Sequence, residues 1–213
     1  ELETEYSKNL TNYLADLLFI NETPVLKRYI LNTESNGYAD IIQNLIVDEP
    51  DTIFFCGEYD ILANLITQAR EAGVNAVFLT EKLGMDSGIS VLADHAYLEG
   101  LLAIVPEPPS IAELSENPRA VSFWREYKEL VEDFENVDIK DPGTFAPYAY
   151  DAFNIYIDAM KKANSINPSD FIDELRNTTY EGVTGNIEFD EKGDRKNPES
   201  TVIVMKNGTW VRN

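Results

Sequence analysis

Two short charged segments carry the residue types that could bind or react with a small molecule. They are Gly57-Glu58-Tyr59 and Thr80-Glu81-Lys82, and each follows a short apolar run, residues 52–55 and residues 76–79. Apolar runs of this length, rich in aromatic and aliphatic residues, are typical of buried strands. Carboxylates, a lysine and a phenol gathered in one place could hold an ionic solute or move a proton.

The residues between the two runs predict a helix that brings both charged segments together. From Tyr59 onward the apolar residues recur at helical spacing, and Gly73 suits the end of a helix. A strand–helix–strand unit is nearly always a right-handed crossover between parallel strands. The two segments should therefore lie at the carboxyl edge of one parallel sheet, which is where open α/β sheets bind their ligands.

Catalysis has little support in the sequence. Asp151 and Asp158 would lie on one helix, and Glu58 stands beside Tyr59, so either pair could imitate a general acid and base. The sequence shows no Ser-His-Asp order, phosphate-binding glycine loop or cluster of metal ligands to support them. We therefore predict that the protein is not an enzyme.

The composition of the chain excludes several classes of binding partner. The chain has 213 residues, with 38 acidic against 17 basic side chains and a formal net charge of -21, which argues against nucleic acid or an anionic membrane surface as a partner. Cys56 is the single cysteine, and the lone His95 has no second histidine or cysteine with which to make a soft metal site. No cofactor and no metal site are therefore predicted. No apolar run approaches the ~20 residues that a membrane span needs.

The character of the chain changes near Val105, where alternating strands and helices give way to mostly helical sequence. The predicted fold class is therefore α/β, with a parallel sheet flanked by helices. The first part predicts a helix at residues 4–19, a strand near the sheet edge at 25–31, a helix from residue 38 that stops before Pro50, and a strand at 100–105. The second part predicts helices from residue 117, at 145–164 and at 168–175, followed by β segments at 184–190 and 201–211.

Several segments together resemble a known family. The most specific are QAREAG at residues 68–73, AYDA at 149–152 and EGVTGNIEFDEKGD at 181–194. In this order and spacing they are similar to the extracellular solute-binding proteins of branched-chain amino acid ABC transporters, the type I periplasmic binding proteins of the Leu/Ile/Val-binding kind. The resemblance covers essentially the whole chain but leaves the upstream part of the family's fold without a counterpart.

The resemblance implies an incomplete two-lobe architecture, in which the lobes close over a solute by hinge motion. By analogy, residues 1–105 form the sheet domain of the second lobe, residues 106–199 the helical part of the first lobe, and residues 200–213 a return strand to the second lobe. Most of the amino-terminal lobe is missing, so the aromatic stripe of the 145–164 helix would lack a cover. We expect that lobe to belong to the same, longer protein; the alternative is a second chain or a domain-swapped copy.

The resemblance also implies which residues line the cleft. Tyr6 matches a tyrosine that contacts the ligand from the second lobe, and Phe145 matches an aromatic residue that lines the side-chain pocket. Glu58 matches a tyrosine that contacts the bound amino acid, and Tyr59 follows it at the same sheet edge. Lys82 matches a carboxylate that holds the ligand's ammonium group. Here the sequence departs from the family, because a lysine repels an ammonium.

Three interpretations of this departure stay open. In the first, the ligand is an amino acid, and either Glu58 holds its ammonium with Lys82 alongside or Glu81 swings in from the next position. In the second, Lys82 faces an anionic ligand such as an organic or aromatic carboxylate. In the third, Glu58 and Lys82 merely pair with each other at the sheet edge and bind no solute.

The resemblance implies a solute-binding component of an ABC transporter, located outside the cell or in the periplasm and working with a membrane permease. An amino-terminal segment absent from this sequence could anchor it to the membrane. The alternative is the extracellular ligand-binding sensor of a signalling receptor. Much of the family's contact to the ligand carboxylate comes from the amino-terminal lobe, so we expect this chain alone to bind its solute weakly or not at all.

Overall fold

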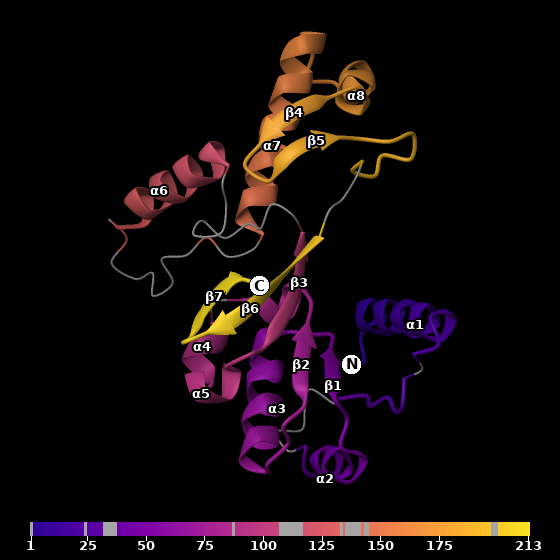
Figure 1. Cartoon of the computed structure of the whole chain (residues 1–213). Coiled ribbons are helices and arrows are strands. Elements are labelled where there is room, and N and C mark those ends of the chain that lie inside the picture. The colour runs from indigo at the N-terminus through magenta and orange to yellow at the C-terminus, as the bar shows by residue number, and fades with distance from the viewer. Residues whose placement is uncertain are drawn as a thin grey trace. The chain divides into compact units, whose positions relative to one another are not determined.

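The computed structural model divides the chain into two compact units, residues 1–104 with 202–213 and residues 105–201. Each unit is described by itself (Figure 1). The structure describes residues 2–23, 25–31, 38–86, 88–106, 117–132, 134, 142, 145–196 and 200–213. Within these residues no helix is both long enough and apolar enough to cross a membrane.

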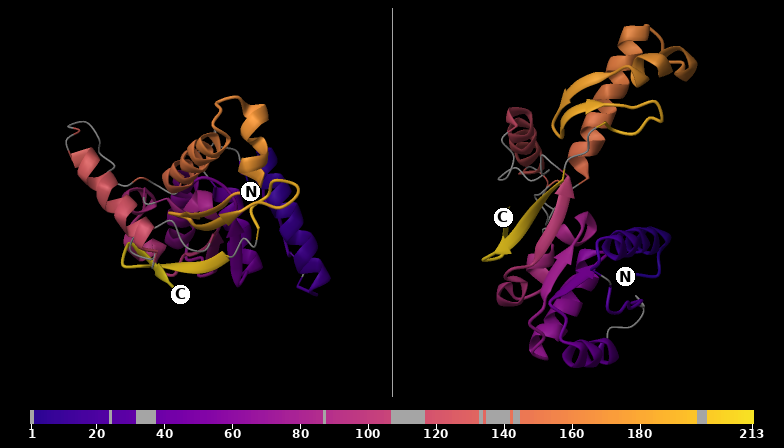
Figure 2. Two further views of the ribbon diagram at one scale, coloured as in Figure 1. Left: turned by 90° about the horizontal axis from the view of Figure 1, so that it is seen from above. Right: turned by 45° about the vertical axis from the view of Figure 1, so that its right-hand side comes forward.

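The first unit is built on a five-stranded sheet in the order β1-β2-β3-β6-β7. The strands are β1 (Thr52–Phe55), β2 (Val77–Thr80), β3 (Leu102–Pro106), β6 (Ser200–Lys206) and β7 (Thr209–Arg212). The β1, β2 and β3 strands run parallel, whereas β6 and β7 form an antiparallel hairpin that closes the sheet beside β3 (Figure 2). The parallel β1–β2 pair confirms the predicted strand–helix–strand unit.

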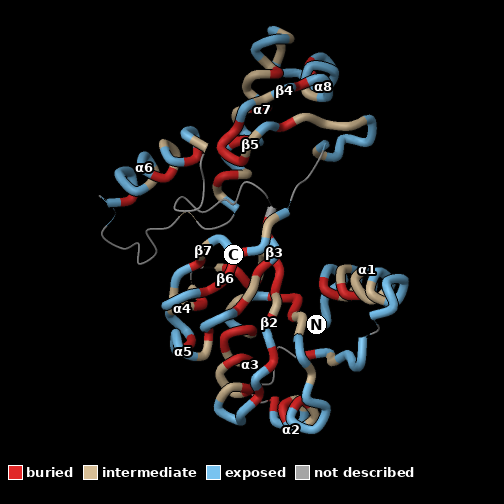
Figure 3. Tube along the Cα trace, viewed as in Figure 1, coloured by how far each residue is buried: buried red, intermediate tan, exposed pale blue. Residues whose placement is uncertain are grey.

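The core of the first unit lies between this sheet and the crossover helix. The helices of the unit are α1 (Glu5–Ile20), α2 (Ala39–Asp48), α3 (Tyr59–Glu71), the short 3-10 helix η1 (Lys82–Met85), α4 (Ile89–Leu92) and α5 (His95–Leu98). Leu62, Ile66 and Ala69 of α3 are buried together with Phe55 and Phe78 of the sheet. Figure 3 shows this burial along the strands and α3. The helical spacing of the apolar residues thus gives α3 the buried face that the sequence predicts.

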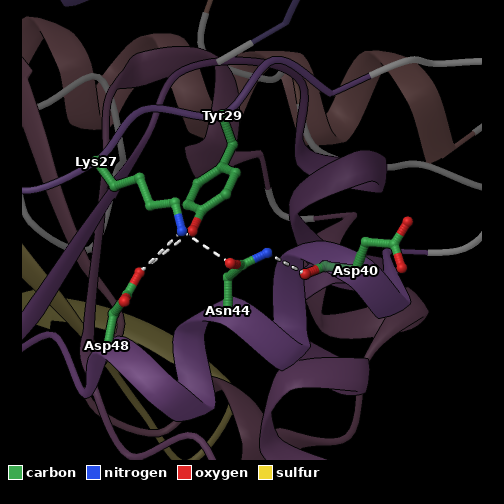
Figure 4. A network of polar contacts seen from close by, with 5 residues as sticks. All are labelled: Lys27, Tyr29, Asp40, Asn44 and Asp48. Carbon is green, nitrogen blue, oxygen red and sulfur yellow. Dashed lines mark hydrogen bonds and ion pairs between the residues drawn. The ribbon is translucent and has the colours of Figure 1, made fainter.

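The strand predicted at residues 25–31 is not formed. Within the described chain these residues make only one bridge, a parallel pair between Leu31 and Leu2. Their side chains hold them instead: Lys27 Nζ donates to Asn44 Oδ1 (2.7 Å) and Asp48 Oδ2 (3.2 Å) of α2 (Figure 4). The Arg28 guanidinium donates to Asn12 Oδ1 (2.8 Å) and Thr11 Oγ1 (2.8 Å) of α1. The prediction was wrong because a strand needs a neighbouring strand along its length.

In its described residues the second unit has three helices and a small hairpin. Its elements are α6 (Pro118–Glu132), α7 (Ala146–Ala163), α8 (Pro168–Arg176), β4 (Thr179–Gly182) and β5 (Gly185–Glu188). The helices confirm the predictions, and α7 packs on α8 with the Tyr156 and Phe171 rings edge to face at 5.4 Å. The β4 strand was missed, and it pairs antiparallel with β5.

A buried carboxylate ties the hairpin to α7. Asp151 is only 1% exposed and accepts hydrogen bonds from Val183 N (2.8 Å), Thr184 N (2.7 Å) and Thr184 Oγ1 (2.7 Å). Gly182 packs so closely on this carboxylate that a Cβ atom there would overlap it. Asp158 is instead paired with Lys162 on the helix surface (3.1 Å). Asp151 therefore has a structural role, and the acid–base pair considered from the sequence does not form.

Candidate functional site

Glu81 is the buried carboxylate at the carboxyl edge of the first unit's sheet. It follows β2 and is 7% exposed. Its Oε2 atom accepts hydrogen bonds from Tyr6 OH (3.2 Å) and from Leu83 N (3.0 Å). Its Oε1 atom is buried and has no hydrogen-bond partner among the residues that the structure describes. One oxygen thus accepts two hydrogen bonds, and the other is a buried acceptor that no donor of the described residues reaches.

The local sequence explains why Glu81 turns inward. Thr80 ends β2 and is fully buried, and Glu81 is the N-cap of η1, where its side chain accepts from the backbone of the first turn. Such a cap satisfies a backbone N–H that has no partner within the helix. Tyr6 reaches Glu81 from α1, 75 residues away in the sequence. The position of α1 is fixed by Ser7, whose buried Oγ donates to Cys56 O at the end of β1 (3.1 Å).

Burial dominates the electrostatics of this cluster. It raises the pKa of the Glu81 carboxyl, although the Leu83 N–H, the Tyr6 hydroxyl, the Gly57 N–H and the Lys82 charge act in the opposite direction. Burial, followed by the Glu81 charge, raises the pKa of Tyr6 to about 12. Burial also lowers the pKa of the half-buried Lys82 ammonium, which the Glu81 charge partly offsets. Removal from water therefore disfavours the charged forms of both Glu81 and Lys82.

Five of the six predicted site residues lie in the first unit, and Phe145 lies in the second. Glu58 and Tyr59 open α3 at the same sheet edge, with Glu58 exposed as the N-cap and Tyr59 half-buried. The Tyr59 ring lies against Gly88, where a Cβ atom would come within 2.7 Å of it. Phe145 belongs to the second unit, is 56% exposed and precedes α7. Its place in the same site as the other five residues stays a prediction.

The sequence did not predict two contacts of this site, one from a backbone N–H and one from a side chain. Leu83 contributes its N–H to Glu81, and Ser7 holds the helix that carries Tyr6. A glutamate directly before a short helical turn was a signal for the first contact. The second depends on the three-dimensional approach of α1 to β1, for which the sequence carries no local signal.

The second unit contains a hollow of about 280 Å³ between α6, α7 and β4, lined among others by Phe123, Tyr150 and Tyr180. Its charged lining residues, Arg119 and Glu126, are exposed. Glu81 is the stronger candidate, because an unpaired buried acceptor demands a donor and an aromatic hollow does not. Among the described residues no group of three histidine, cysteine, aspartate or glutamate side chains could hold a metal ion.

Residues 3–208 match a family model described as the receptor family ligand binding region. The chain belongs to this family. It is 30% identical over 172 residues to a leucine-, isoleucine-, valine-, threonine- and alanine-binding protein of Pseudomonas aeruginosa, covering 81% of this chain and 43% of the relative. It is 26% identical over 200 residues to the leucine-specific-binding protein of Salmonella typhimurium, covering 93% of this chain and 50% of the relative. The chain thus spans about half the length of these relatives.

Solved structures show the same fold. A leucine-binding protein of Thermotoga maritima has a TM-score of 0.82 and 25% identity, covering 99% of this chain and 57% of that structure. A solute-binding protein of Rhodopseudomonas palustris in complex with benzoate has a TM-score of 0.81 and 11% identity, covering 99% and 55% of the two chains. A branched-chain amino acid transporter's substrate-binding protein from Streptococcus pneumoniae, in complex with isoleucine, has a TM-score of 0.78, 19% identity and coverages of 97% and 55%. The fold is that of the type I periplasmic binding proteins, as the sequence predicted.

Proposed function

We propose that the protein is the solute-binding component of an ABC transporter and that it binds an amino acid whose ammonium group is held by Glu81. The observation that carries the proposal is the Oε1 atom of Glu81, which is buried without a hydrogen-bond donor in the described chain. A buried acceptor left unpaired costs free energy, and an ammonium group would remove that cost by donating to it. The similarity to binding proteins for leucine and related amino acids supports this class of ligand.

A ligand ammonium also suits the charge of the site. Burial disfavours ionised Glu81, and a positive charge in contact with the carboxylate would favour it again. In this proposal Glu81, one residue before Lys82, supplies the carboxylate that the family has at the position of Lys82. Lys82 lies next to it with a charge that acts on Glu81. In this arrangement Lys82 balances Glu81 and is not the group that receives the ammonium.

The other predicted residues complete the site. Tyr6 orients the Glu81 carboxylate and offers its half-exposed ring to the apolar part of the solute. Glu58 and Tyr59 border the site from the start of α3, and Phe145 lines it from the second unit. We assign residues 1–105 and 200–213 to the second lobe and residues 106–199 to the helical part of the first, with the solute between the lobes.

The proposed setting follows from the relatives. The protein works outside the cell or in the periplasm and passes its solute to a membrane permease. The rest of the amino-terminal lobe, from the same or another chain, covers the exposed aromatic residues Phe153 and Tyr156 of α7. The 213-residue chain then carries one side of the site, and its affinity for a free amino acid is in the millimolar range, the low end of the affinity scale.

Matched ligands test the role of Glu81. Leucine, isopentylamine and 4-methylpentanoate share one apolar skeleton and differ in whether they carry an ammonium, a carboxylate or both. We expect leucine and isopentylamine to shift the backbone NMR signals of Tyr6, Glu81 and Leu83 at millimolar concentration, and 4-methylpentanoate to leave them unchanged. Glu81→Gln should weaken isopentylamine binding roughly 10- to 100-fold, because a hydrogen bond to a charged group contributes about 1.5–3 kcal/mol.

Glu71→Gln is the matched control, since it removes the same charge from an exposed position at the end of α3. It should leave binding of all three ligands unchanged. The proposal is wrong if 4-methylpentanoate binds as well as leucine and Glu81→Gln has no effect, a result that would favour an anionic solute held by Lys82. Micromolar binding of leucine to this chain in calorimetry would contradict the expected division of the site between lobes.

A further inference from the structure

Ser7 is the buried side chain that joins α1 to the end of β1. It is 1% exposed, and its Oγ atom donates to Cys56 O, directly after the strand (3.1 Å). Thr11, one turn further along, is the other buried residue of α1, and its Oγ1 atom donates within the helix, to Ser7 O (2.7 Å). The two buried side chains of α1 thus differ in their acceptors: the hydroxyl of Ser7 reaches the sheet, and that of Thr11 donates to its own helix.

The first turn of α1 carries Ser7 and Tyr6 in two fixed directions. Thr4 caps the helix, and its side chain accepts a hydrogen bond from Ser7 N (3.1 Å). Consecutive residues of a helix lie ~100° apart around its axis, so Ser7 can face β1 while Tyr6 faces Glu81. The 3.2 Å between Tyr6 OH and Glu81 Oε2 is longer than the usual O–H···O distance of about 2.5–3.0 Å. A contact of this length does not hold the helix by itself, and a small displacement of the first turn would break it.

The acceptor of Ser7 belongs to a peptide group that also acts on Glu81. The C=O of Cys56 and the N–H of Gly57 are parts of one planar unit, and in the usual trans form they point in opposite directions. The C=O accepts from Ser7, and the N–H favours the charged form of the Glu81 carboxyl. A hydrogen bond to the C=O polarises the peptide and strengthens its N–H as a donor. Ser7 is therefore connected to Glu81 by two short routes, one through Tyr6 and one through Gly57.

We propose that Ser7 is a positioning residue of the solute site, whose hydroxyl holds the first turn of α1 and the peptide after β1 in place around Glu81. The inference rests on the proposed function, in which Glu81 receives the ammonium group of the solute. Ser7 acts through its neighbours and does not touch the solute. Without the hydroxyl, Cys56 O loses a buried donor, and the first turn of α1 is free to shift and to withdraw Tyr6 from the carboxylate.

The ionisation of Tyr6 tests this arrangement without any ligand. Burial, followed by the Glu81 charge, raises the pKa of Tyr6 to about 12, with a smaller contribution from Cys56. At pH 11 about a tenth of such a phenol is ionised, against about nine tenths at the ordinary pKa of about 10. We expect Ser7→Ala to move the pKa of Tyr6 toward 10, because the phenol then leaves both its buried position and the Glu81 charge. The measurement is ¹³C NMR of the tyrosine-labelled chain, with the Tyr6 signal assigned by its loss in Tyr6→Phe.

Three control variants separate the Ser7 hydroxyl from its surroundings. Thr11→Val removes the other buried hydroxyl of α1 at nearly constant size and should leave the pKa of Tyr6 near 12. Ser7→Thr and Ser7→Val have nearly the same shape and differ in the hydroxyl. We therefore expect the threonine variant to keep the raised Tyr6 pKa and the valine variant to lose it.

Isopentylamine binding at pH 7 extends the test to the solute site and does not depend on the alkaline titration. Ser7→Ala should weaken binding at least about fivefold, the effect of losing one hydrogen bond. In the double variant with Tyr6→Phe, the combined loss should stay below the product of the two single losses, because both changes remove the same contact with Glu81. Thr11→Val should bind isopentylamine as the unmodified chain does.

Failure of this proposal and failure of the proposed function give different results. A Tyr6 pKa near 10 in the unmodified chain, or one that stays near 12 in Ser7→Ala, would overturn the positioning role. An equal shift in Thr11→Val would assign the effect to general loosening of α1, and single losses that multiply in the double variant would show that Ser7 does not act through Tyr6. If the Tyr6 pKa responds as expected but the unmodified chain does not bind isopentylamine, the proposed function of Glu81 is wrong and the positioning of Tyr6 by Ser7 stands.

Discussion

Two buried carboxylates, one in each unit, are used in opposite ways. Asp151 is 1% exposed, and its two oxygens receive three hydrogen bonds from the β4–β5 turn. Glu81 is 7% exposed, and within the described residues the hydrogen bonds from Tyr6 OH and Leu83 N both reach Oε2, whereas Oε1 has no hydrogen-bond partner. A satisfied carboxylate stabilises the fold around it, whereas a half-satisfied one keeps binding capacity at the expense of stability. Hydrogen bonding alone therefore distinguishes Asp151, a structural carboxylate, from Glu81, a candidate ligand-binding carboxylate.

The largest expected effect is at Asp151. Asp151→Ala leaves the N–H groups of Val183 and Thr184 buried without an acceptor, at roughly 1–3 kcal/mol for each. We expect the free energy of unfolding of the second unit to fall by about 3 kcal/mol in urea titrations followed by Trp124 fluorescence, in a Trp210→Phe background. The control is Asp158→Asn, which disrupts an exposed ion pair on the same helix and should cost no more than about 0.5 kcal/mol. Equal losses in the two variants would remove the distinction.

The stability effect of Glu81 should have the opposite sign. The pKa of its carboxyl is raised in the folded chain, so the folded state keeps the proton to higher pH than the unfolded state. The associated stability is full below the ordinary glutamate pKa and is lost as pH rises through the folded-state value. Without ligand, Glu81→Gln should therefore stabilise the first unit at pH 7, by an amount on the order of 1 kcal/mol, and have no such benefit near pH 4.

Urea unfolding of the first unit, followed by Trp210 fluorescence in a Trp124→Phe background, measures this difference. Glu71→Gln is again the charge-matched control, and as an exposed substitution it should change the free energy of unfolding by no more than about 0.5 kcal/mol. A destabilised Glu81→Gln variant at pH 7 would mean that the charged carboxylate contributes to the fold as Asp151 does.

A smaller effect is expected at Tyr6. Tyr6→Phe removes the hydroxyl that donates to Glu81 Oε2 and keeps the ring. Losing this hydrogen bond, which contributes about 1 kcal/mol, should weaken isopentylamine binding roughly fivefold. NMR titration gives the dissociation constant. Tyr13→Phe on the exposed face of α1 is the control, and an equal loss in that variant would show that the effect does not come from the contact with Glu81.

The sequence predicted those parts of the fold in which the spacing of apolar residues within one segment determines the structure. The helical spacing from Tyr59 and the two apolar runs beside it determine the β1–α3–β2 unit and the sheet edge on which Glu81 lies. Residues 25–31 have the composition of a strand, but a ladder also requires a neighbour, and none is described along most of their length. The β4 strand was missed because its residues are mostly polar or small and only its pairing with β5 makes it a strand.

The candidate site was predicted less completely, because it too depends on contacts between segments that are distant in the sequence. The sequence left Glu58, Glu81 and Lys82 as alternatives for the charged contact, since all three follow strands at the same edge. The choice depends on contacts made in three dimensions, namely the N–H of Leu83 and the hydroxyl of Tyr6. These contacts hold the buried Glu81 side chain, whereas Glu58 is exposed at the start of α3.

The most direct test of the role of Glu81 is the ionisation of its own carboxyl. A ¹³C NMR pH titration, with the Glu81 signal assigned by its loss in Glu81→Gln, gives the pKa in the free chain and at saturating leucine. We predict a pKa above the usual glutamate range in the free chain, which moves down when leucine binds, because an ammonium group favours the charged carboxylate. A pKa that stays the same or rises with leucine would contradict the account, because Glu81 would then not receive the ammonium.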